Sequence, residues 1–414
     1  MKVGTKMYNK NQLERNKRVN FTIKTIPWFK GFSDDLIFYI AINTLFLTIV
    51  KNFTASQISL FTTIPCLCYI LLQRFFLKII KKINNKKSVC LGCLLLLIAS
   101  IIITFAKSFW VVMVGQILFT IAFIFKSMDN IILKNNLLHL NKEDDFIKYK
   151  NKASIIYSIV TTIIALSSGY LFKINNYLPM YLCILSCIIN LIISLMLTEE
   201  IPNKEYFKED NKQKKVKFNY TIILIMISYG LFYAVISRGQ ANSKLMIQYQ
   251  LSDYFDVGKT AIYFSYILVL SRISRVLSNI VFYKVYSKVK ERIGYYLPIL
   301  CGCAFSLIIV GFFTQPILVK FIIMTIGFCI ILGIRDVFGT YMQDLLLRKS
   351  KISEQQTFIS YLGFSRKVGE TILSFIFSMI LLKLDLLYVI IILLILTIIC
   401  LNINYKLYKI VRSN

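Results

Sequence analysis

The chain has 414 residues, 57% of them hydrophobic and only 17% charged, with a mean hydropathy of +0.66. This composition excludes an ordinary soluble domain and indicates an integral membrane protein. The formal net charge of +29 would suggest a nucleic-acid partner for a soluble chain. In a membrane protein, basic loops on the cytoplasmic side explain it, so we expect no nucleic-acid partner.

Residues 1–26 are basic and too polar for a signal-peptide core, so they are expected to form a mobile cytoplasmic tail. Apolar stretches of roughly the 20 residues that a membrane span needs follow this tail within 27–198. The predicted helices of this N-terminal half lie at 27–50, 56–80, 88–106, 109–133, 153–172 and 178–197.

The composition changes at 199–219, a charged segment with Pro202 that we predict to be a cytoplasmic linker. A second half follows at 220–404, and 405–414 is a short basic tail. The predicted helices of this C-terminal half lie at 220–238, 260–282, 293–313, 316–338, 358–382 and 384–402.

The loop charges predict the orientation of these helices. With both termini in the cytoplasm, most of the 49 Lys and Arg residues fall on the cytoplasmic side. The opposite face receives only Lys51, Lys107, Lys173, Lys244, Lys259, Lys320 and Lys383. The positive-inside rule therefore predicts a multi-pass protein of the cytoplasmic membrane with both ends inside.

No catalytic or metal site is expected. All ten cysteines lie in apolar stretches, and Cys90-x-x-Cys93 has neither a second pair nor a nearby histidine. The one histidine, His139, lies in a polar stretch. We therefore expect no cofactor and no enzymatic activity.

Charged residues inside the predicted spans follow a pattern. Apart from Lys30, Lys78 and Lys320, which are counted with the adjoining tail and loops, eight cations lie there, namely Arg74, Lys126, Arg238, Arg272, Arg275, Arg335, Arg366 and Lys367. Every third helix, at 88–106, 178–197, 293–313 and 384–402, carries none. Because a charge inside a membrane must face protein or water, we expect these four helices to face lipid and the others to line a central cavity.

At this point the chain resembles the major facilitator superfamily. Lys86-Lys87 matches the basic end of that family's signature between helices 2 and 3, although Asn85 and Lys81 stand where a Gly and an Asp are expected. Ser167-Ser168-Gly169 is not the family's Gly-Pro antiporter motif. The resemblance implies an all-α fold of twelve transmembrane helices in two six-helix halves, and secondary transport by alternating access.

The stretch 358–382 carries three charges in its inner half. Glu370 follows Arg366 by four residues and Lys367 by three, so the three share one helix face. That face either lines an aqueous path for an anion or forms an internal ion pair that joins two helices. Glu370 is the candidate for proton coupling, because altered pairing with the cations would change its protonation. A permanent salt bridge is the alternative.

The other charges fall at two depths. An inner gate is predicted from residues near the cytoplasmic ends, namely Asp34, Asp35, Arg74, Lys126, Asp129, Arg335 and Asp336. The gate would close by ion pairs across the two halves, and ion pairing within each half is the alternative. The deeper cations, predicted to bind substrate opposite the single carboxylate of Glu370, are Arg272, Arg275, Arg366 and Lys367.

Such a cationic excess is costly unless water or an anion compensates it, and arginine matches carboxylate and phosphate geometry. We therefore expect a monomeric secondary active transporter of a small organic anion or zwitterion, coupled to protons. The alternatives are a drug or lipid exporter of the same fold and a non-transporting membrane sensor.

Overall fold

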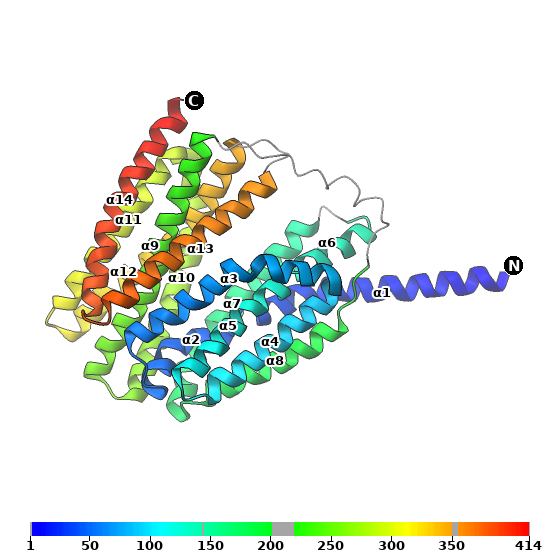
Figure 1. Cartoon of the computed structure of the whole chain (residues 1–414), viewed down its shortest axis with the longest axis horizontal. Helices are drawn as coiled ribbons and strands as arrows, with labels where there is room; N and C mark the ends of the chain where they lie inside the picture. Colours follow the sequence, from blue (N-terminus) through cyan, green and yellow to red (C-terminus); the bar gives the residue numbers. More distant parts are fainter. Residues whose placement is uncertain (1, 143–144, 201–218, 350–354, 414) are drawn as a thin grey trace. The chain divides into compact units, whose positions relative to one another are not determined.

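The structure is a computed structural model that describes residues 2–142, 145–200, 219–349 and 355–413 (Figure 1). Within these ranges, 11 segments are long and apolar enough to cross a membrane. A further helix of span length, α13 (Gln355–Ile380), carries Arg366, Lys367 and Glu370. The predicted all-α fold of twelve transmembrane helices is confirmed. Residues 201–218 of the predicted linker lie outside the described ranges.

The helices of the N-terminal part are α1 (Lys2–Ser33), α2 (Ile37–Leu45), the π-helical turn η1 (Phe46–Val50), α3 (Ala55–Ile83), α4 (Asn85–Phe105), α5 (Phe109–Lys126), α6 (Asp129–His139), α7 (Phe146–Ile174) and α8 (Leu178–Met196). Those of the C-terminal part, besides α13, are α9 (Tyr220–Tyr254), α10 (Val257–Val289), the short 3₁₀ turn η4 (Lys290–Arg292), α11 (Ile293–Phe313), α12 (Ile317–Lys349) and α14 (Leu386–Ser413).

The first helix corrects the prediction of a mobile tail. α1 begins at Lys2 and runs through Pro27 to Ser33. Val19, Ile23 and Ile26 recur at helical spacing on it and are almost fully buried against α4 and α6. The many lysines and arginines between them hid this apolar stripe, which anchors the segment to the helical core.

Two predicted spans are interrupted. The first breaks between α1 and α2, so that Asp34 and Asp35 lie in a non-helical turn and not on a regular helix. The fourth breaks between α5 and α6, which places Lys126 at the C-terminus of α5 and Asp129 at the N-terminus of α6. These positions suit a cation and an anion respectively, because the helix dipole is negative at its C-terminus and positive at its N-terminus.

The described chain separates into two compact units. Unit 1 comprises Met1–Ile42, Leu71–Ser167 and Asn175–Lys214, and unit 2 comprises Asn43–Ile70, Ser168–Ile174 and Lys215–Asn414. Unit 2 therefore includes segments that the sequence assigns to the N-terminal half. The division of the chain into two sequence halves stays a prediction.

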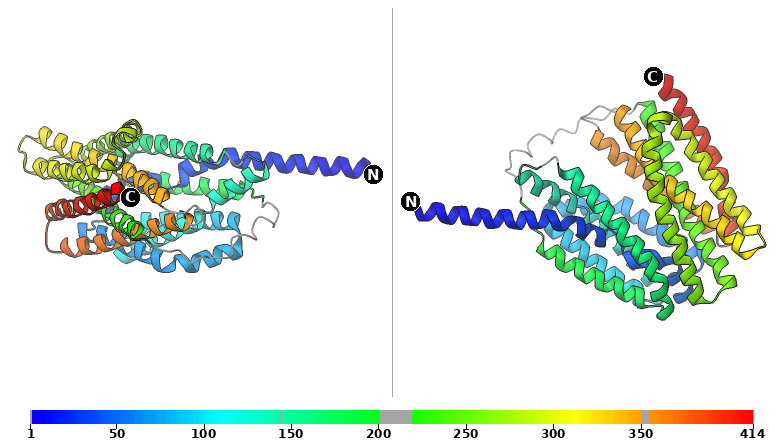
Figure 2. Two further views of the ribbon diagram at one scale, coloured as in Figure 1. Left: turned by 90° about the horizontal axis from the view of Figure 1, so that it is seen from above. Right: turned by 180° about the vertical axis from the view of Figure 1, so that it is seen from behind.

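Within unit 1, α4 packs on both α5 and α8. Within unit 2, α9 packs on α12, α13 and α14, and α11 lies between α12 and α14 (Figure 2). Exposed apolar side chains form helical stripes on the four uncharged helices, for example Leu185, Ile189 and Ile192 on α8. Such stripes suit a lipid-facing position.

Several helices extend beyond their predicted ends. α9 continues to Tyr254, where a polar loop was predicted after residue 238. α12 continues to Lys349, so Arg335 and Asp336 lie near its middle and not late in it. These extensions move predicted loop residues, above all Lys244, into the helical framework.

Candidate functional site

Four charged residues form an ion-pair quartet in unit 1. Lys126 Nζ lies 2.6 Å from Asp34 Oδ1 and 3.8 Å from Asp129 Oδ2. Lys30 Nζ lies 3.1 Å from Asp129 Oδ1 and 3.9 Å from Asp34 Oδ1. The side chains of Lys126 and Asp129 are only 2% and 1% exposed, so water does not solvate their charges and each is stabilised by its ion-pair partners. With two lysines and two aspartates the quartet is electrically neutral.

The quartet contains three of the predicted gate residues, and its pairs lie within one part of the chain. Lys30 was not among the predicted gate residues, although its position four residues before Asp34 was a signal. Asp35 accepts a hydrogen bond from the Tyr157 hydroxyl at 3.2 Å. The side chain of Arg74 lies outside what the structure describes. Pairing across the two halves stays a prediction.

A second cluster lies on α13 in unit 2. Arg366 Nε is 3.1 Å from Glu370 Oε1, and Lys367 Nζ is 3.2 Å from Glu370 Oε2. Each carboxylate oxygen therefore meets one cation, as the spacing along the helix predicts. The carboxylate is 3% exposed, whereas the two cations are 35% and 32% exposed. Two cations against one anion leave this surface positive.

The neighbouring helices fix the position of Arg366. Its guanidinium lies over the Tyr233 ring of α9, 4.1 Å from the ring centroid. α9 and α13 approach closely because Gly369 faces the Gly230 carbonyl, where an added Cβ would overlap that oxygen. Within the described part of the chain, the two terminal nitrogens of Arg366 make no hydrogen bond to protein. The planar guanidinium is therefore held in place while the N–H groups of its terminal nitrogens remain available as donors.

Lys367 contacts a different helix from Arg366. Its Nζ lies 4.0 Å from Cys66 Sγ and 6.0 Å from the centroid of the Tyr69 ring, both on α3. Arg238, at 8% exposure on α9, is close enough to Glu370 to interact with it electrostatically. It lies near the middle of α9, whereas the predicted helix 220–238 ended at this residue.

The third cluster joins α10 to α12. Arg275 bonds Asp336, and Arg335 Nε lies 3.5 Å from the second oxygen of the same carboxylate. Arg335 Nη1 donates to Gln240 Oε1 on α9 at 2.8 Å. The prediction that Arg275 stands with Arg366 opposite Glu370 alone is therefore wrong, because Asp336 supplies a second carboxylate.

Lys244 is a partly buried cation on α9, although the loop charges had predicted it on the outer face. Its Nζ donates to Asn43 Oδ1 at 2.6 Å and lies 5.5 Å from the centroid of the Phe264 ring. Arg272, the remaining predicted substrate ligand, lies near enough to Lys244 to interact with it electrostatically. Lys244 was missed because the apolar run ends near residue 238 while the helix continues.

Further polar contacts within unit 2 bind residues 43–59 to α9 and α13. Gln248 Nε2 donates to Thr48 Oγ1 at 2.6 Å. Ser56 and Ser59 of α3 donate to the carbonyl oxygens of Ser378 and Ser374 at 2.8 and 3.0 Å. These bonds hold residues 43–59 against the C-terminal helices in this conformation.

Membrane-spanning helices with buried charge clusters and a positive, partly exposed surface define a multi-pass membrane transporter. The model of the Major Facilitator Superfamily matches residues 28–372, and the chain belongs to this family. It is therefore a secondary transporter and not an enzyme. The chain has no significant match among curated protein sequences.

Solved structures share the fold at low sequence identity. The nucleoside transporter NupG is 12% identical with a TM-score of 0.74, covering 94% of this chain and 99% of its own. A bacterial homologue of the iron transporter ferroportin in an inward-facing state is 13% identical with a TM-score of 0.66, covering 96% and 99%. A bacterial homologue of the human lysosomal transporter Spinster is 12% identical with a TM-score of 0.69, covering 95% and 97%.

Proposed function

We propose that this transporter moves a small organic anion or zwitterion across the cytoplasmic membrane by alternating access. The single observation that carries the proposal is the way the guanidinium of Arg366 is held. Glu370 holds its Nε and Tyr233 supports its plane, while its terminal nitrogens remain available among the described residues. A planar fork of this kind binds a carboxylate or phosphate through two parallel hydrogen bonds.

The surrounding charge supports the same ligand class. Lys367 adds a second cation beside Arg366, and one carboxylate serves both. A positive surface held inside a membrane protein is stabilised by a bound anion. It repels lipophilic cations, which argues against the alternative of a cationic-drug exporter, and it repels metal cations such as the cargo named for the ferroportin homologue.

Proton coupling belongs to the same proposal. Glu370 is the buried carboxylate in direct contact with both candidate ligands of the anion. An anion that bonds Arg366 weakens the hold of the arginine on Glu370, and a proton can then replace the lost cation. We also propose that the termini face the cytoplasm, because the most basic loops are predicted on the same side as both termini and the positive-inside rule favours the cytoplasm for such loops.

Uptake into proteoliposomes tests the proposal. The panel contains labelled mono- and dicarboxylates, amino acids, a phosphate ester, a nucleoside and a lipophilic cation, with wild type and Arg366→Gln compared. We expect uptake of one anionic or zwitterionic class, reduced at least tenfold in Arg366→Gln. The control is Arg348→Gln, at a 44% exposed arginine that pairs with Glu291. Uptake of the lipophilic cation alone, equal in all three proteins, would contradict the proposal.

A further inference from the structure

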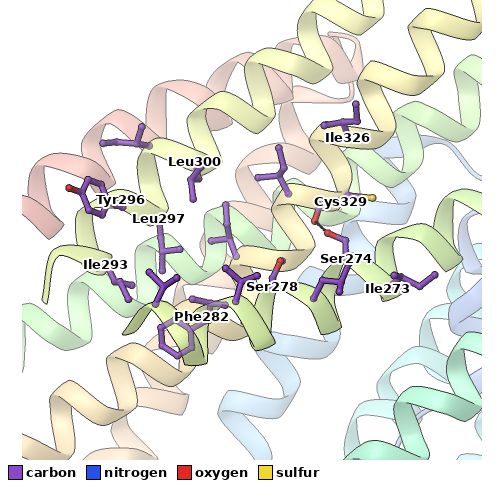
Figure 3. Close-up of a pocket in the computed structure, with 18 of the residues that line it drawn as sticks. Ile273, Ser274, Ser278, Phe282, Ile293, Tyr296, Leu297, Leu300, Ile326 and Cys329 are labelled. Atoms are coloured by element: carbon purple, nitrogen blue, oxygen red, sulfur yellow. Dashed lines mark hydrogen bonds between the residues drawn. The ribbon is translucent and has the colours of Figure 1, made fainter. Parts of the chain in front are cut away.

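A large groove lies in unit 2, and the residues that line it are uncharged. It has a volume of about 960 Å³ and is lined by α10, α11 and α12 (Figure 3). α10 and α11 each pack on α12 more extensively than on each other, so α12 closes the back of the groove. Small residues bring α10 against α12, since Ser274 donates to the Cys329 carbonyl at 3.1 Å and Ser278 fills the space of a Cβ at Gly333.

The walls of the groove are apolar over a length that matches a membrane. Along α10 the lining runs from Leu270 to Val289, roughly 29 Å at 1.5 Å per residue. The hydrocarbon core of a bilayer is about 30 Å thick. Arg272 lies about half a helical turn from the centre of this lining, on the opposite side of α10, and Arg275 lies about a quarter of a turn from it. The groove therefore opens on the lipid-facing side of the helix.

One end of the groove is basic and aromatic. Tyr296 lines it with 41% of its surface exposed, and Arg292 lies beside Tyr296 and Tyr408. Lys288 is exposed on α10 along the same helical face as the lining. The acidic residues near this end, Glu291 and Asp344, both bond Arg348.

We propose that this groove binds one anionic phospholipid, with an acyl chain along α10 and α11 and the headgroup at Lys288 and Arg292. The acyl chain covers the apolar part of the groove in the leaflet that holds the headgroup, and the two cations attract a phosphate group. Tyr296 suits the level where hydrocarbon meets headgroup, because its ring is apolar and its hydroxyl is polar.

Native mass spectrometry of the delipidated full chain tests the proposal. The probes are phosphatidylglycerol and phosphatidylcholine with identical acyl chains. We expect one bound phosphatidylglycerol, with at least tenfold higher affinity than for phosphatidylcholine. Leu277→Trp with Ile326→Trp fills the groove at side chains that are 55% and 48% exposed, and should lower binding of both lipids at least tenfold.

The matched control places the same bulk elsewhere. Ile189→Trp with Ile192→Trp on α8, at 48% and 54% exposure, should leave the tight adduct intact. Lys288→Gln with Arg292→Gln should reduce the preference for phosphatidylglycerol to threefold or less. Lys152→Gln, at an exposed lysine of α7 in unit 1, should leave the preference unchanged.

Three outcomes would overturn the inference. Equal binding in the groove-filling variant and the α8 control would place the lipid elsewhere. Equal affinity for the two lipids in wild type would remove the headgroup site. A dimer that disappears only in the groove-filling variant would show that a second copy of the chain, and not a lipid, covers the groove.

Discussion

Arg366 and Glu370 contact one another within a single turn of α13, with Nε of the arginine 3.1 Å from Oε1 of the carboxylate. This contact uses one side of the guanidinium and leaves its terminal nitrogens available among the described residues. Glu370 therefore orients the arginine as well as balancing part of its charge. Any ligand that binds the guanidinium of Arg366 changes the electrostatic surroundings of Glu370.

Glu370→Gln should separate exchange from accumulation. The amide keeps the size of the side chain and one acceptor oxygen, but it cannot take up and release a proton. We expect counterflow in proteoliposomes to stay within about threefold of wild type, while uptake against a gradient is lost. Glu291→Gln, at a 28% exposed carboxylate, is the control and should retain both activities. Uphill uptake by Glu370→Gln would remove this residue from coupling.

Lys126→Met should strongly destabilise the protein. The substitution leaves Asp34 and Asp129 with one fewer cation, and Asp129 is 1% exposed. Breaking a buried ion pair by removing one partner typically costs about 3–5 kcal/mol. Thermal unfolding in detergent and urea unfolding measure the loss.

Lys148→Met provides the matched control for that prediction. Lys148 pairs with Asp145 at 3.7 Å, but its side chain is 75% exposed. Removing such a surface pair should cost about 0–1 kcal/mol. Equal losses in the two variants would show that the quartet is not a stabilising feature.

Gly369→Ala should loosen the packing of α13 on α9. The new methyl group would overlap the Gly230 carbonyl oxygen, so the backbones must separate. Overpacking of this kind costs about 1–3 kcal/mol. Thermal unfolding should show a lower melting temperature.

Gly363→Ala is the control on the same helix, because nothing lies within 4 Å of a Cβ at that position. Alanine favours helix over glycine by about 0.5–1 kcal/mol, so this variant should be neutral or slightly more stable than wild type. A melting temperature for Gly369→Ala equal to that of Gly363→Ala would contradict the close approach of the two helices.

Lys244→Met should favour opening at the end of unit 2 where residues 43–59 contact α9 and α13. The variant loses the 2.6 Å bond to Asn43 Oδ1, so a conformation without that contact gains population. A cysteine introduced at Ser59 should react several-fold faster with a membrane-impermeant maleimide in the Lys244→Met variant than in the protein that keeps Lys244. Lys259→Met, at a 63% exposed lysine, should leave the rate unchanged. A slower reaction in Lys244→Met would contradict this role.

The sequence predicts those parts of the structure that depend on local spacing. Glu370 meets Arg366 and Lys367 because residues three and four apart share a helix face. The helix count follows from apolar runs of span length, and charge-free helices show exposed apolar stripes as expected.

Features set by packing between helices were not predictable in this way. Arg275 meets Asp336 only because α10 packs on α12. Lys244 was predicted in a loop because hydropathy falls after residue 238, yet it lies on α9 with its Nζ in contact with Asn43 and near the Phe264 ring. The helical continuation of α1 was hidden because its buried stripe is narrow and surrounded by basic residues.

A thermal-shift screen of the purified protein tests the central claim most directly, namely that Arg366 binds an organic anion. The panel contains anionic, zwitterionic and cationic metabolites, and a ligand that binds the folded state raises the melting temperature by mass action. The account predicts stabilisation by one anionic or zwitterionic class, lost in Arg366→Gln and retained in Arg348→Gln. Stabilisation by lipophilic cations alone, unchanged in Arg366→Gln, would contradict it and make the cluster on α13 a structural ion pair.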